Sequence, residues 1–194
     1  MAGVGAGQNR VGRVPLTTYT PAMNYAMIDT ALGTMGLAWT PVGVTRLALP
    51  GQDRAETERR IGAGAERGAP DVALAGRIIA YGEGERVEFD DVPLDLDGQP
   101  PFHRAVYDDI LKLRWGETTT YGDIARRLGD VGLSRAVGQA LGRNPVPLIV
   151  PCHRVLAADG RTGGFSAPGG ASAKMRMLAL ERAADPRGQY SLGF

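Results

Sequence analysis

Hydrophobic positions follow one period in the first half of the chain and another in the second. From residue 24 to residue 50, short apolar runs are separated by Gly33 and by turn residues 41–43, which predicts a small antiparallel meander. Residues 53–68 (DRAETERRIGAGAERG) predict a polar-faced helix, and residues 71–84 (DVALAGRIIAYGEG) predict a shorter, more apolar one. The first part of the chain is therefore expected to be a small α/β unit.

A proline-containing linker at residues 96–101 leads into a helical part. Beyond it, four apolar side chains recur at steps of four, four and three residues, the spacing of an amphipathic helix: Phe102, Val106, Ile110 and Leu113. The charge also changes sign, because residues 1–100 carry 9 Arg and no Lys against 13 Asp and Glu, whereas residues 101–194 carry 13 Arg and Lys against 8 Asp and Glu. The basic second half is the better candidate for contact with a polyanion.

Two short helices are predicted after residue 117. In TTTYGDIARRLG (residues 118–129), Thr120 is the expected N-cap and Asp123 follows three residues later, a capping-box arrangement. In SRAVGQALGRN (residues 134–144), Ser134 is the expected N-cap, and an Asn-Pro pair ends the helix. The tight turn between them suggests a helix-turn-helix whose second helix contacts DNA, although two packed helices also occur in any bundle.

The second of these helices is rich in small side chains: Ser134, Ala136, Gly138 and Ala140. Two interpretations stay open. Small residues let helices pack closely, or they form a smooth face that lies against a DNA groove while Arg135 projects into the duplex. Gly138 costs up to about 1 kcal/mol relative to alanine, and a close approach to DNA would be a reason to tolerate it.

The single cysteine lies in PVPLIVPCHRVL (residues 145–156), directly after the second helix. Its three prolines exclude a helix and a central strand, so Cys152 is expected on a rigid, extended segment, either as a small buried hydrophobe or as a nucleophile. Neighbours in an extended segment point to opposite faces, so a water would have to link His153 to the thiol. An orienting carboxylate would come from Asp159, which is assigned to a turn, or from Glu181 on a final helix predicted to start at an N-cap serine, residue 172.

Two further side chains near these elements have two interpretations each. Arg154 is either a phosphate ligand or a scaffold that bonds local carbonyl groups, and we favour the scaffold. Tyr121, at the start of the first short helix, either stacks or hydrogen-bonds with a ligand, or simply packs at the helix start.

Composition and missing motifs exclude several classes of site. One Cys and two His do not make a thiolate-rich zinc site, and no glycine-rich phosphate loop opens a helix, so no metal and no cofactor are expected. No apolar run is long enough to cross a membrane. Residues 1–20 have no secretory apolar core and are expected to be a disordered leader. A lone cysteine suits the reducing cytoplasm, where we expect the protein.

Taken together, these residues resemble a known family, the O6-alkylguanine-DNA alkyltransferases, also called methylated-DNA–protein-cysteine methyltransferases. The similarity runs through PFHRAVYDDILKL, TTTYGDIARRLG, SRAVGQALGRNPVPLIVPCHRVL and GGFSAPGGASAKMRMLALE, which cover nearly all of residues 100–182. Residues 24–100 match more loosely, in TALGTMGLAWTPVGVTRLALP and VPLDLDGQPPF.

The resemblance implies a role for each matching residue. Cys152 would accept the alkyl group, His153 would deprotonate it through a water, and Glu181 would orient His153. Asn144 would tie the active-site turn together, and Tyr121 would bond guanine N3 and supply a proton to the leaving base.

The remaining implied residues contact the DNA or the base. Arg135 would replace the flipped nucleotide in the stack, flanked by other DNA-contacting residues: Ser134, Ala136, Gly138 and Arg143. The base pocket would contain Val155, whose main-chain carbonyl reads the guanine amino group, together with Phe165, Ser166 and Arg154. Phe165 stands where many relatives have tyrosine, and it keeps the apolar wall for the base.

The implied fold is an N-terminal α/β domain with a ribonuclease-H-like small sheet plus helices, followed by a mainly helical, winged helix-turn-helix-like domain. The expected divisions are a leader at 1–20, the N-terminal domain at 21–97, the DNA-binding and alkyl-transfer domain at 98–186, and a tail at 187–194. The implied function is direct reversal of O6-alkylguanine damage in double-stranded DNA by a monomer, with base flipping and one irreversible transfer per molecule. Activity on O4-alkylthymine and cooperative binding to DNA stay open.

Two other functions are weighed against this one. Alkyltransferase-like proteins bind such lesions without repairing them, but they generally lack the acceptor cysteine that this chain has. A cysteine hydrolase would use Cys152 and His153, but the sequence offers no orienting Asn or Asp pattern for it.

Overall fold

The computed structural model describes residues 22–183, and the predicted leader at 1–20 and tail at 187–194 lie outside them. Strands β1 (Asn24–Thr30), β2 (Gly33–Trp39) and β3 (Val44–Ala48) form the expected antiparallel meander. The short strand β4 (Glu66–Arg67) pairs in parallel with β1, so the sheet order is β3-β2-β1-β4. Gly33 follows the turn between β1 and β2 with φ of 117°, a conformation that suits glycine.

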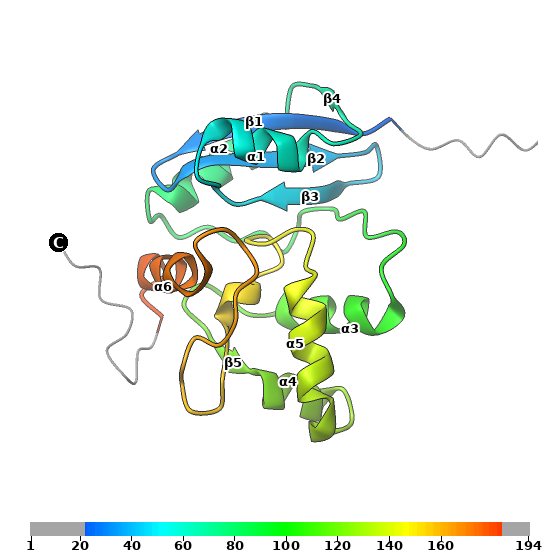
Figure 1. Ribbon diagram of the computed structural model, residues 1–194, viewed down its shortest axis with the longest axis vertical. Coiled ribbons are helices and arrows are strands. Elements are labelled where there is room, and N and C mark those ends of the chain that lie inside the picture. The colour runs from blue at the N-terminus through cyan, green and yellow to red at the C-terminus, as the bar shows by residue number, and fades with distance from the viewer. Residues whose placement is uncertain (1–21, 184–194) are drawn as a thin grey trace, which may run out of the picture.

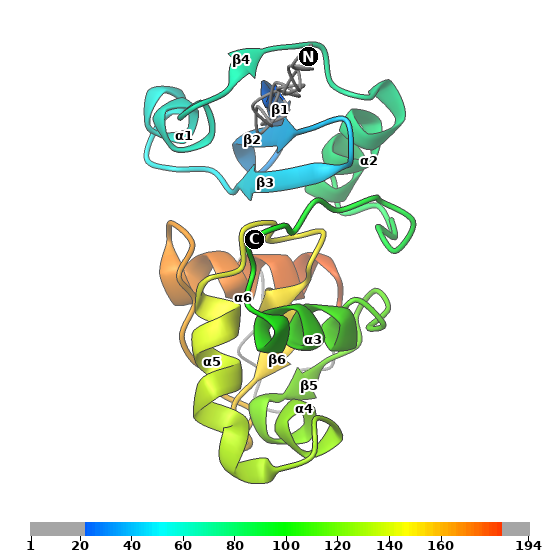
Figure 2. The same cartoon turned by 90° about the vertical axis from the view of Figure 1, so that its right-hand side faces the viewer.

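Two helices accompany this sheet (Figures 1 and 2), and each begins at an aspartate. The side chain of Asp53 accepts a hydrogen bond from Glu56 N at the start of α1 (Arg54–Ile61), and that of Asp71 accepts one from Leu74 N at the start of α2 (Val72–Gly82). With 11 residues against 8, α2 is the longer helix, so the predicted order of lengths is wrong. Buried side chains of α2, including Ile78 and Tyr81, pack in the same hydrophobic core as the helices of the second part of the protein.

An extended segment connects the sheet to the helices beneath it (Figure 1). Val44 N donates to Pro93 O, and Asp95 N donates to Val44 O, each at 2.9 Å, so the connection runs alongside β3 before α3 (Pro101–Ile110) begins. Leu47 N of the same strand donates to Pro145 O at 2.9 Å. The edge strand of the sheet is therefore bonded both to the linker and to the segment that precedes Cys152.

The second part contains short elements packed below the sheet (Figure 2). Strand β5 (Thr119–Thr120) leads directly into α4 (Tyr121–Arg127), and the 3-10 turn η1 (Val131–Leu133) leads into α5 (Ser134–Gly142). The 3-10 turn η2 (Cys152–Arg154) continues into β6 (Val155–Leu156), which pairs in parallel with β5, and α6 (Gly170–Leu180) closes the unit. Tyr107 of α3 donates its hydroxyl to Ala140 O of α5 at 2.9 Å, which holds these two helices together.

The predicted helix starts are partly correct. Thr120 Oγ1 accepts from Asp123 N at 3.1 Å, and the Asp123 carboxylate accepts from the Thr120 hydroxyl, so the predicted cap of α4 is confirmed. Ser134 does not cap α5, because η1 runs straight into the helix and Ser134 already has helical dihedral angles. The predicted cap at residue 172 is also wrong, since Gly169, in a left-handed conformation with φ of 80°, precedes the first residue of α6.

One hydrophobic core spans both parts of the protein. It includes Leu37 and Leu47 from the sheet, Tyr81 from α2, and Val106 and Val137 from the helices beneath. Among the described residues, no helix is long and apolar enough to cross a membrane. The shared core fixes the position of α2 relative to the segment that carries the thiol, and this matters for the chemistry below.

Candidate active site

Cys152 lies at the start of the 3-10 turn η2 and is 7% exposed. Asn144 holds the preceding loop closed, because its Nδ2 donates to Val150 O at 2.8 Å and its Oδ1 accepts from Val146 N at 3.0 Å. Leu148, inside this loop, has φ of 80°, which a non-glycine residue seldom adopts. The prediction of an extended segment is therefore wrong at Cys152 and His153, but successive side chains of a 3-10 turn also diverge, so the two still point apart.

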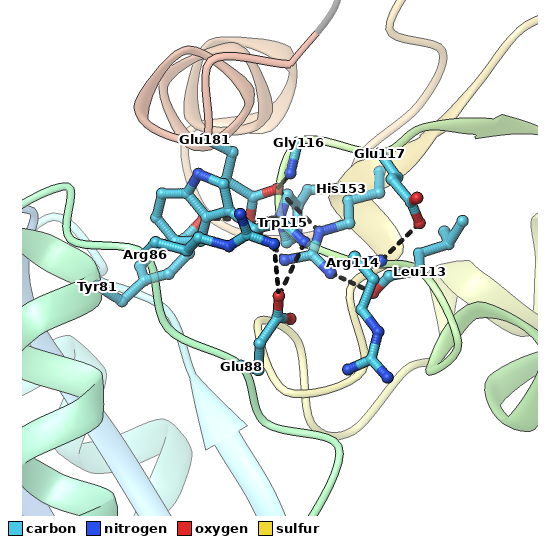
Figure 3. Close-up of polar contacts among 11 residues, drawn as sticks. Tyr81, Arg86, Glu88, Leu113, Arg114, Trp115, Gly116, Glu117, His153 and Glu181 are labelled. Atoms are coloured by element: carbon cyan, nitrogen blue, oxygen red, sulfur yellow. Dashed lines mark hydrogen bonds and ion pairs between the residues drawn. The ribbon is translucent and has the colours of Figure 1, made fainter.

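Glu181 accepts hydrogen bonds from five donors, and Figure 3 labels three of the residues that supply them, Tyr81, Gly116 and His153. Its Oε1 lies 2.7 Å from His153 Nε2, and it also accepts from the Tyr81 hydroxyl and from Arg154 Nη2, each at 3.1 Å. Its Oε2 accepts from Arg154 Nε at 2.8 Å and from Gly116 N at 3.3 Å. Glu181 is 1% exposed and His153 is fully buried, so these bonds replace all contact with water.

This arrangement fixes the tautomer of His153. An ionised carboxylate only accepts hydrogen bonds, so Nε2 must carry a proton, and in the neutral ring Nδ1 then has a free lone pair. Nδ1 is buried, and no group among residues 22–183 bonds it. The ring is therefore held with an unused basic nitrogen inside the protein, as a general base requires.

Opposing effects determine the charges of this pair. Burial raises the pKa of Glu181, but the charges and hydrogen bonds of His153 and Arg154 outweigh it and lower that pKa to about 2. Burial lowers the pKa of His153, and the neighbouring Glu181 only partly offsets the effect. At neutral pH the carboxylate is thus ionised and the imidazole is neutral.

The thiol itself is not ionised in the resting protein. Burial raises the pKa of Cys152, although the Asn144 side chain, the Lys174 ammonium group and the backbone N–H groups of the turn act in the opposite direction. Because desolvation disfavours the thiolate, the thiol keeps its proton until a base removes it during the reaction.

A cavity of about 670 Å³ opens onto Cys152 from the side of α4 and α5. Besides Cys152, its walls include six residues that were predicted for the site: Tyr121, Ser134, Arg135, Gly138, Phe165 and Ser166. Leu141, Gly142 and Gly164, which were not predicted, complete the walls. Gly163 has φ of 65°, and a Cβ atom there would lie 3.1 Å from the Tyr121 hydroxyl oxygen, so the loop approaches this ring closely. The Tyr121 hydroxyl makes one long hydrogen bond, 3.4 Å to Gly164 O.

Comparisons with known proteins agree with this geometry. Residues 101–183 match the family model of the 6-O-methylguanine DNA methyltransferase DNA-binding domain. The methylated-DNA–protein-cysteine methyltransferase of Mycobacterium tuberculosis is 39% identical over 166 residues, which are 84% of this chain and 95% of the relative. This chain belongs to the methylated-DNA–protein-cysteine methyltransferase family.

Two further relatives bear on what the family fold does. The "DNA base-flipping protein" of Thermus thermophilus is 40% identical over 157 residues, which are 80% of this chain and 98% of the relative. The crystal structure of the Mycobacterium tuberculosis OGT protein in complex with DNA has a TM-score of 0.67 and 36% identity, and covers 82% of this chain and 93% of that one. The small sheet plus helices described above is thus the general fold of methyltransferase-family structures.

Some residues expected in the base pocket of this family member lie elsewhere. Arg154 turns away from the cavity, because its guanidinium group bonds Glu181 and donates from Nη1 to Leu113 O at 2.7 Å. Arg154 is absent from the walls of this cavity, and it bonds a carbonyl group as the scaffold interpretation expects, although that carbonyl is distant in sequence rather than local. Val155 is fully buried and is not among the cavity walls, and its carbonyl oxygen accepts from Lys174 Nζ at 2.5 Å.

Two residues expected to contact DNA are also absent from the cavity walls: Ala136 and Arg143. Ala136 lies two positions from both Ser134 and Gly138, and residues two apart face different sides of a helix. Ala140, the last of the small residues, is fully buried beneath α5. The small face of α5 that borders the cavity is instead formed by Ser134, Gly138 and Gly142.

The sequence patterns missed two residues of this site. Tyr81 is 100 positions from Glu181 in sequence, and an apolar helix gives no sign that one hydroxyl reaches a carboxylate. Lys174 is fully buried, and its ammonium group lies over the Tyr121 ring, 5.9 Å from the centroid. A signal for it existed, because this chain has 20 Arg and only 2 Lys, so a lysine seven residues before Glu181 is unusual.

Metal binding has no support in the geometry. Within the described part of the chain, no three His, Cys, Asp or Glu side chains are grouped so that they could hold a metal ion.

Proposed function

We propose that this protein repairs DNA by direct reversal, moving an alkyl group from O6 of guanine to Sγ of its own Cys152. One observation carries the proposal: the only thiol lines a cavity that Tyr121 and Arg135 also border, and the next residue in sequence, His153, is bonded to Glu181. Relatives named methylated-DNA–protein-cysteine methyltransferase support the transfer to cysteine.

On the DNA side, α4 and α5 act as a helix-turn-helix in a winged-helix-like unit, and the N-terminal sheet acts as a ribonuclease-H-like unit, with the division at residues 97 and 98. The reactive carbon is hidden in a stacked base, so the nucleotide must leave the duplex at a cost of a few kcal/mol. Arg135 is exposed on α5 beside the cavity, where it fills the gap in the stack. Gly138 and Ser134 let the duplex approach this helix closely.

The chemical step begins with the thiol proton, which passes through a water to Nδ1 of His153. The Sγ electron pair then forms a bond to the alkyl carbon, the bond from that carbon to O6 breaks, and its electrons return to the guanine ring. Tyr121 delivers a proton to the ring at N3 and regains one from His153 through solvent. Burial and the nearby Cys152 raise the pKa of Tyr121, so its phenol is protonated and able to donate.

The products are unmodified guanine and an S-alkylcysteine. A thioether is not hydrolysed under ordinary conditions, so each molecule acts once and needs no cofactor. The partner is double-stranded DNA that contains O6-alkylguanine, bound by one copy of the chain in the cytoplasm.

A second candidate function comes from the relative named "DNA base-flipping protein". Under this alternative, the chain extrudes the damaged base and holds it without transfer. The buried thiol, next in sequence to a histidine whose Nδ1 bonds no group among residues 22–183, favours transfer.

The two functions are separated by mixing the protein with a duplex that carries O6-methylguanine and measuring its intact mass. Direct reversal predicts a stoichiometric gain of one CH2 group that maps to the peptide of Cys152, and no gain in Cys152→Ser. Tight binding without a mass gain would establish the base-flipping alternative. Repeated turnover on an ester would instead indicate a hydrolase.

A further inference from the structure

Tyr81 joins the N-terminal part of the protein to the active site. It lies on α2, is fully buried, and donates its hydroxyl to Glu181 Oε1 at 3.1 Å (Figure 3). Its ring packs edge-on against Trp115, with 5.5 Å between centroids, and against His153, with 6.4 Å between centroids. These ring contacts fix the orientation of the phenol, and its hydroxyl bonds the same carboxylate oxygen as His153 Nε2.

That shared oxygen determines how strongly His153 holds its proton. Glu181 Oε1 accepts from His153 Nε2 at 2.7 Å and from Tyr81 and Arg154 Nη2 at 3.1 Å each, so Tyr81 is one of three donors that share the same negative charge. A donor that withdraws charge from a carboxylate makes it a weaker partner for an imidazolium ion. A neutral imidazole, with a free lone pair on Nδ1, is the form that can take a proton from Cys152.

We propose that Tyr81 is a positioning residue for alkyl transfer: it holds Glu181 Oε1 against His153 Nε2 and keeps His153 in its neutral, basic form. The inference rests on the proposed function of Cys152 as acceptor. It gives the N-terminal domain a direct part in the chemistry, in addition to its role in the core.

Other charged groups also surround His153 and Glu181. Arg154 of η2 bonds both carboxylate oxygens, and Lys174 of α6 disfavours an imidazolium ion by repulsion. Cys152, the residue before His153, is the other titratable group next to it in sequence. The backbone N–H of Trp115 donates to the Glu88 carboxylate at 3.3 Å, and Glu88 also pairs with Arg86 at the surface.

Removing only the hydroxyl tests the proposal, because phenylalanine keeps the ring packing. In Tyr81→Phe, Oε1 loses a donor, so the pKa of His153 rises. Hydrogen bonds to charged groups are strong enough for a shift of about half to one unit. At a pH one unit below the wild-type midpoint, the rate of Cys152 alkylation should then be about threefold to tenfold lower than in the wild type.

A second buried tyrosine provides the matched control. Tyr107 is also fully buried and donates to Ala140 O, so Tyr107→Phe loses a buried hydroxyl of the same kind without touching Glu181. Both variants are measured with iodoacetamide as the alkylating probe from pH 5 to pH 9. The ¹⁵N signals of the His153 ring are followed in parallel, which is direct because the chain has only two histidines and His103→Gln assigns the other.

The proposal predicts that Tyr81→Phe moves the acid limb of the alkylation profile and the His153 titration to higher pH, while Tyr107→Phe moves neither. Unchanged His153 titration in Tyr81→Phe would overturn it, as would an equal shift in both variants. These readouts need no DNA, so they are independent of the methyl-transfer assay. A wild-type protein that gains no CH2 from O6-methylguanine DNA would overturn the proposed function instead.

Discussion

The ammonium group of Lys174 donates a hydrogen bond to the carbonyl oxygen of Val155 at 2.5 Å, and both residues are fully buried. Val155 directly follows the turn that carries Cys152, so a positive charge on α6 is held next to the segment of the nucleophile. Burial lowers the pKa of Lys174 to about 8, against an ordinary value of 10.5. This cation favours the thiolate and, at the same time, makes folding less favourable.

Lys174→Met should therefore separate stability from reactivity. Between pH 8 and 10.5 the unfolded chain binds more protons at this position than the folded one, so the contribution of Lys174 to stability rises with pH across that window. Relative to the wild type, the Met variant should be more stable at pH 7.5, by up to about 3 kcal/mol, and this advantage should shrink by pH 10. Urea unfolding at both pH values checks this.

The same variant should alkylate more slowly. Without the cation, the pKa of Cys152 rises further, so the iodoacetamide profile should move to higher pH. Lys112, the other lysine, is exposed, and Lys112→Met serves as the control. An unchanged profile in Lys174→Met would show that the ammonium group does not act on the thiol.

Glu181→Gln should destabilise the protein because it leaves Arg154 buried without its counter-charge. Breaking a buried ion pair in this way costs about 3–5 kcal/mol. The lowered pKa of Glu181 means that its stabilisation is complete above about pH 4.5 and is lost as the pH falls toward 2. The difference between variant and wild type, measured by urea unfolding, should thus be constant from pH 5 to 7 and shrink below pH 4.5.

Glu117→Gln, on an exposed carboxylate nearby, controls for the loss of one negative charge. Alkylation of Cys152 in Glu181→Gln should be slower at every pH because His153 loses the group that orients it, and the acid limb should move to lower pH because Glu181 raises the pKa of His153. If Glu181→Gln and Glu117→Gln had the same pH–rate profile, the relay through His153 would be disproved.

Arg135→Ala should separate base extrusion from thiol chemistry. The Arg135 side chain is exposed beside the cavity, apart from the hydrogen bonds that join His153 to Glu181, so the reaction with free O6-benzylguanine should be unchanged. Reaction with O6-methylguanine in a duplex should slow by about tenfold or more, since extrusion costs a few kcal/mol. Equal losses on both substrates would remove the role of Arg135 in base flipping.

Gly138→Ala should make the protein more stable and its DNA binding weaker. A Cβ atom at this position would lie 3.8 Å from the Tyr121 ring, an ordinary contact, so the helix should gain up to about 1 kcal/mol. The added methyl group would stand between α5 and the duplex. Gly76→Ala on α2, where a Cβ meets nothing within 4 Å, should give the stability gain alone. Thermal unfolding and DNA titration at fixed salt distinguish the two, and unweakened DNA binding by Gly138→Ala would argue against close approach.

Sequence patterns predicted those parts of the fold that local chemistry determines. The turn at Gly33 and the cap at Thr120 depend on residues within a few positions, and both appear as expected. The cap at Ser134 failed because an upstream 3-10 turn continues into α5, which the pattern of one helix does not contain. Competition between neighbouring elements, rather than propensity, set that boundary.

The site was predictable to a different extent. The pairing of Cys152 with His153 is visible in sequence, and the family resemblance pointed to Glu181. The hydrogen-bond partners of Arg154 were harder to predict, because Leu113 and Glu181 lie 41 and 27 positions away and only the fold brings them together. Tyr81 had no local signal, since its hydroxyl acts across the interface between the two parts of the protein.

The spacing of two residues along the final helix is more tightly constrained than the identity of the residues between them. Lys174 and Glu181 lie seven residues apart, two turns of helix, so they share the face that meets Val155 and His153. Deleting one residue between them would rotate one against the other by about 100° and remove both contacts together. Side chains along the outer face of α6 can therefore change freely in descendants or engineered variants, whereas an insertion or deletion there would inactivate the protein in a single step.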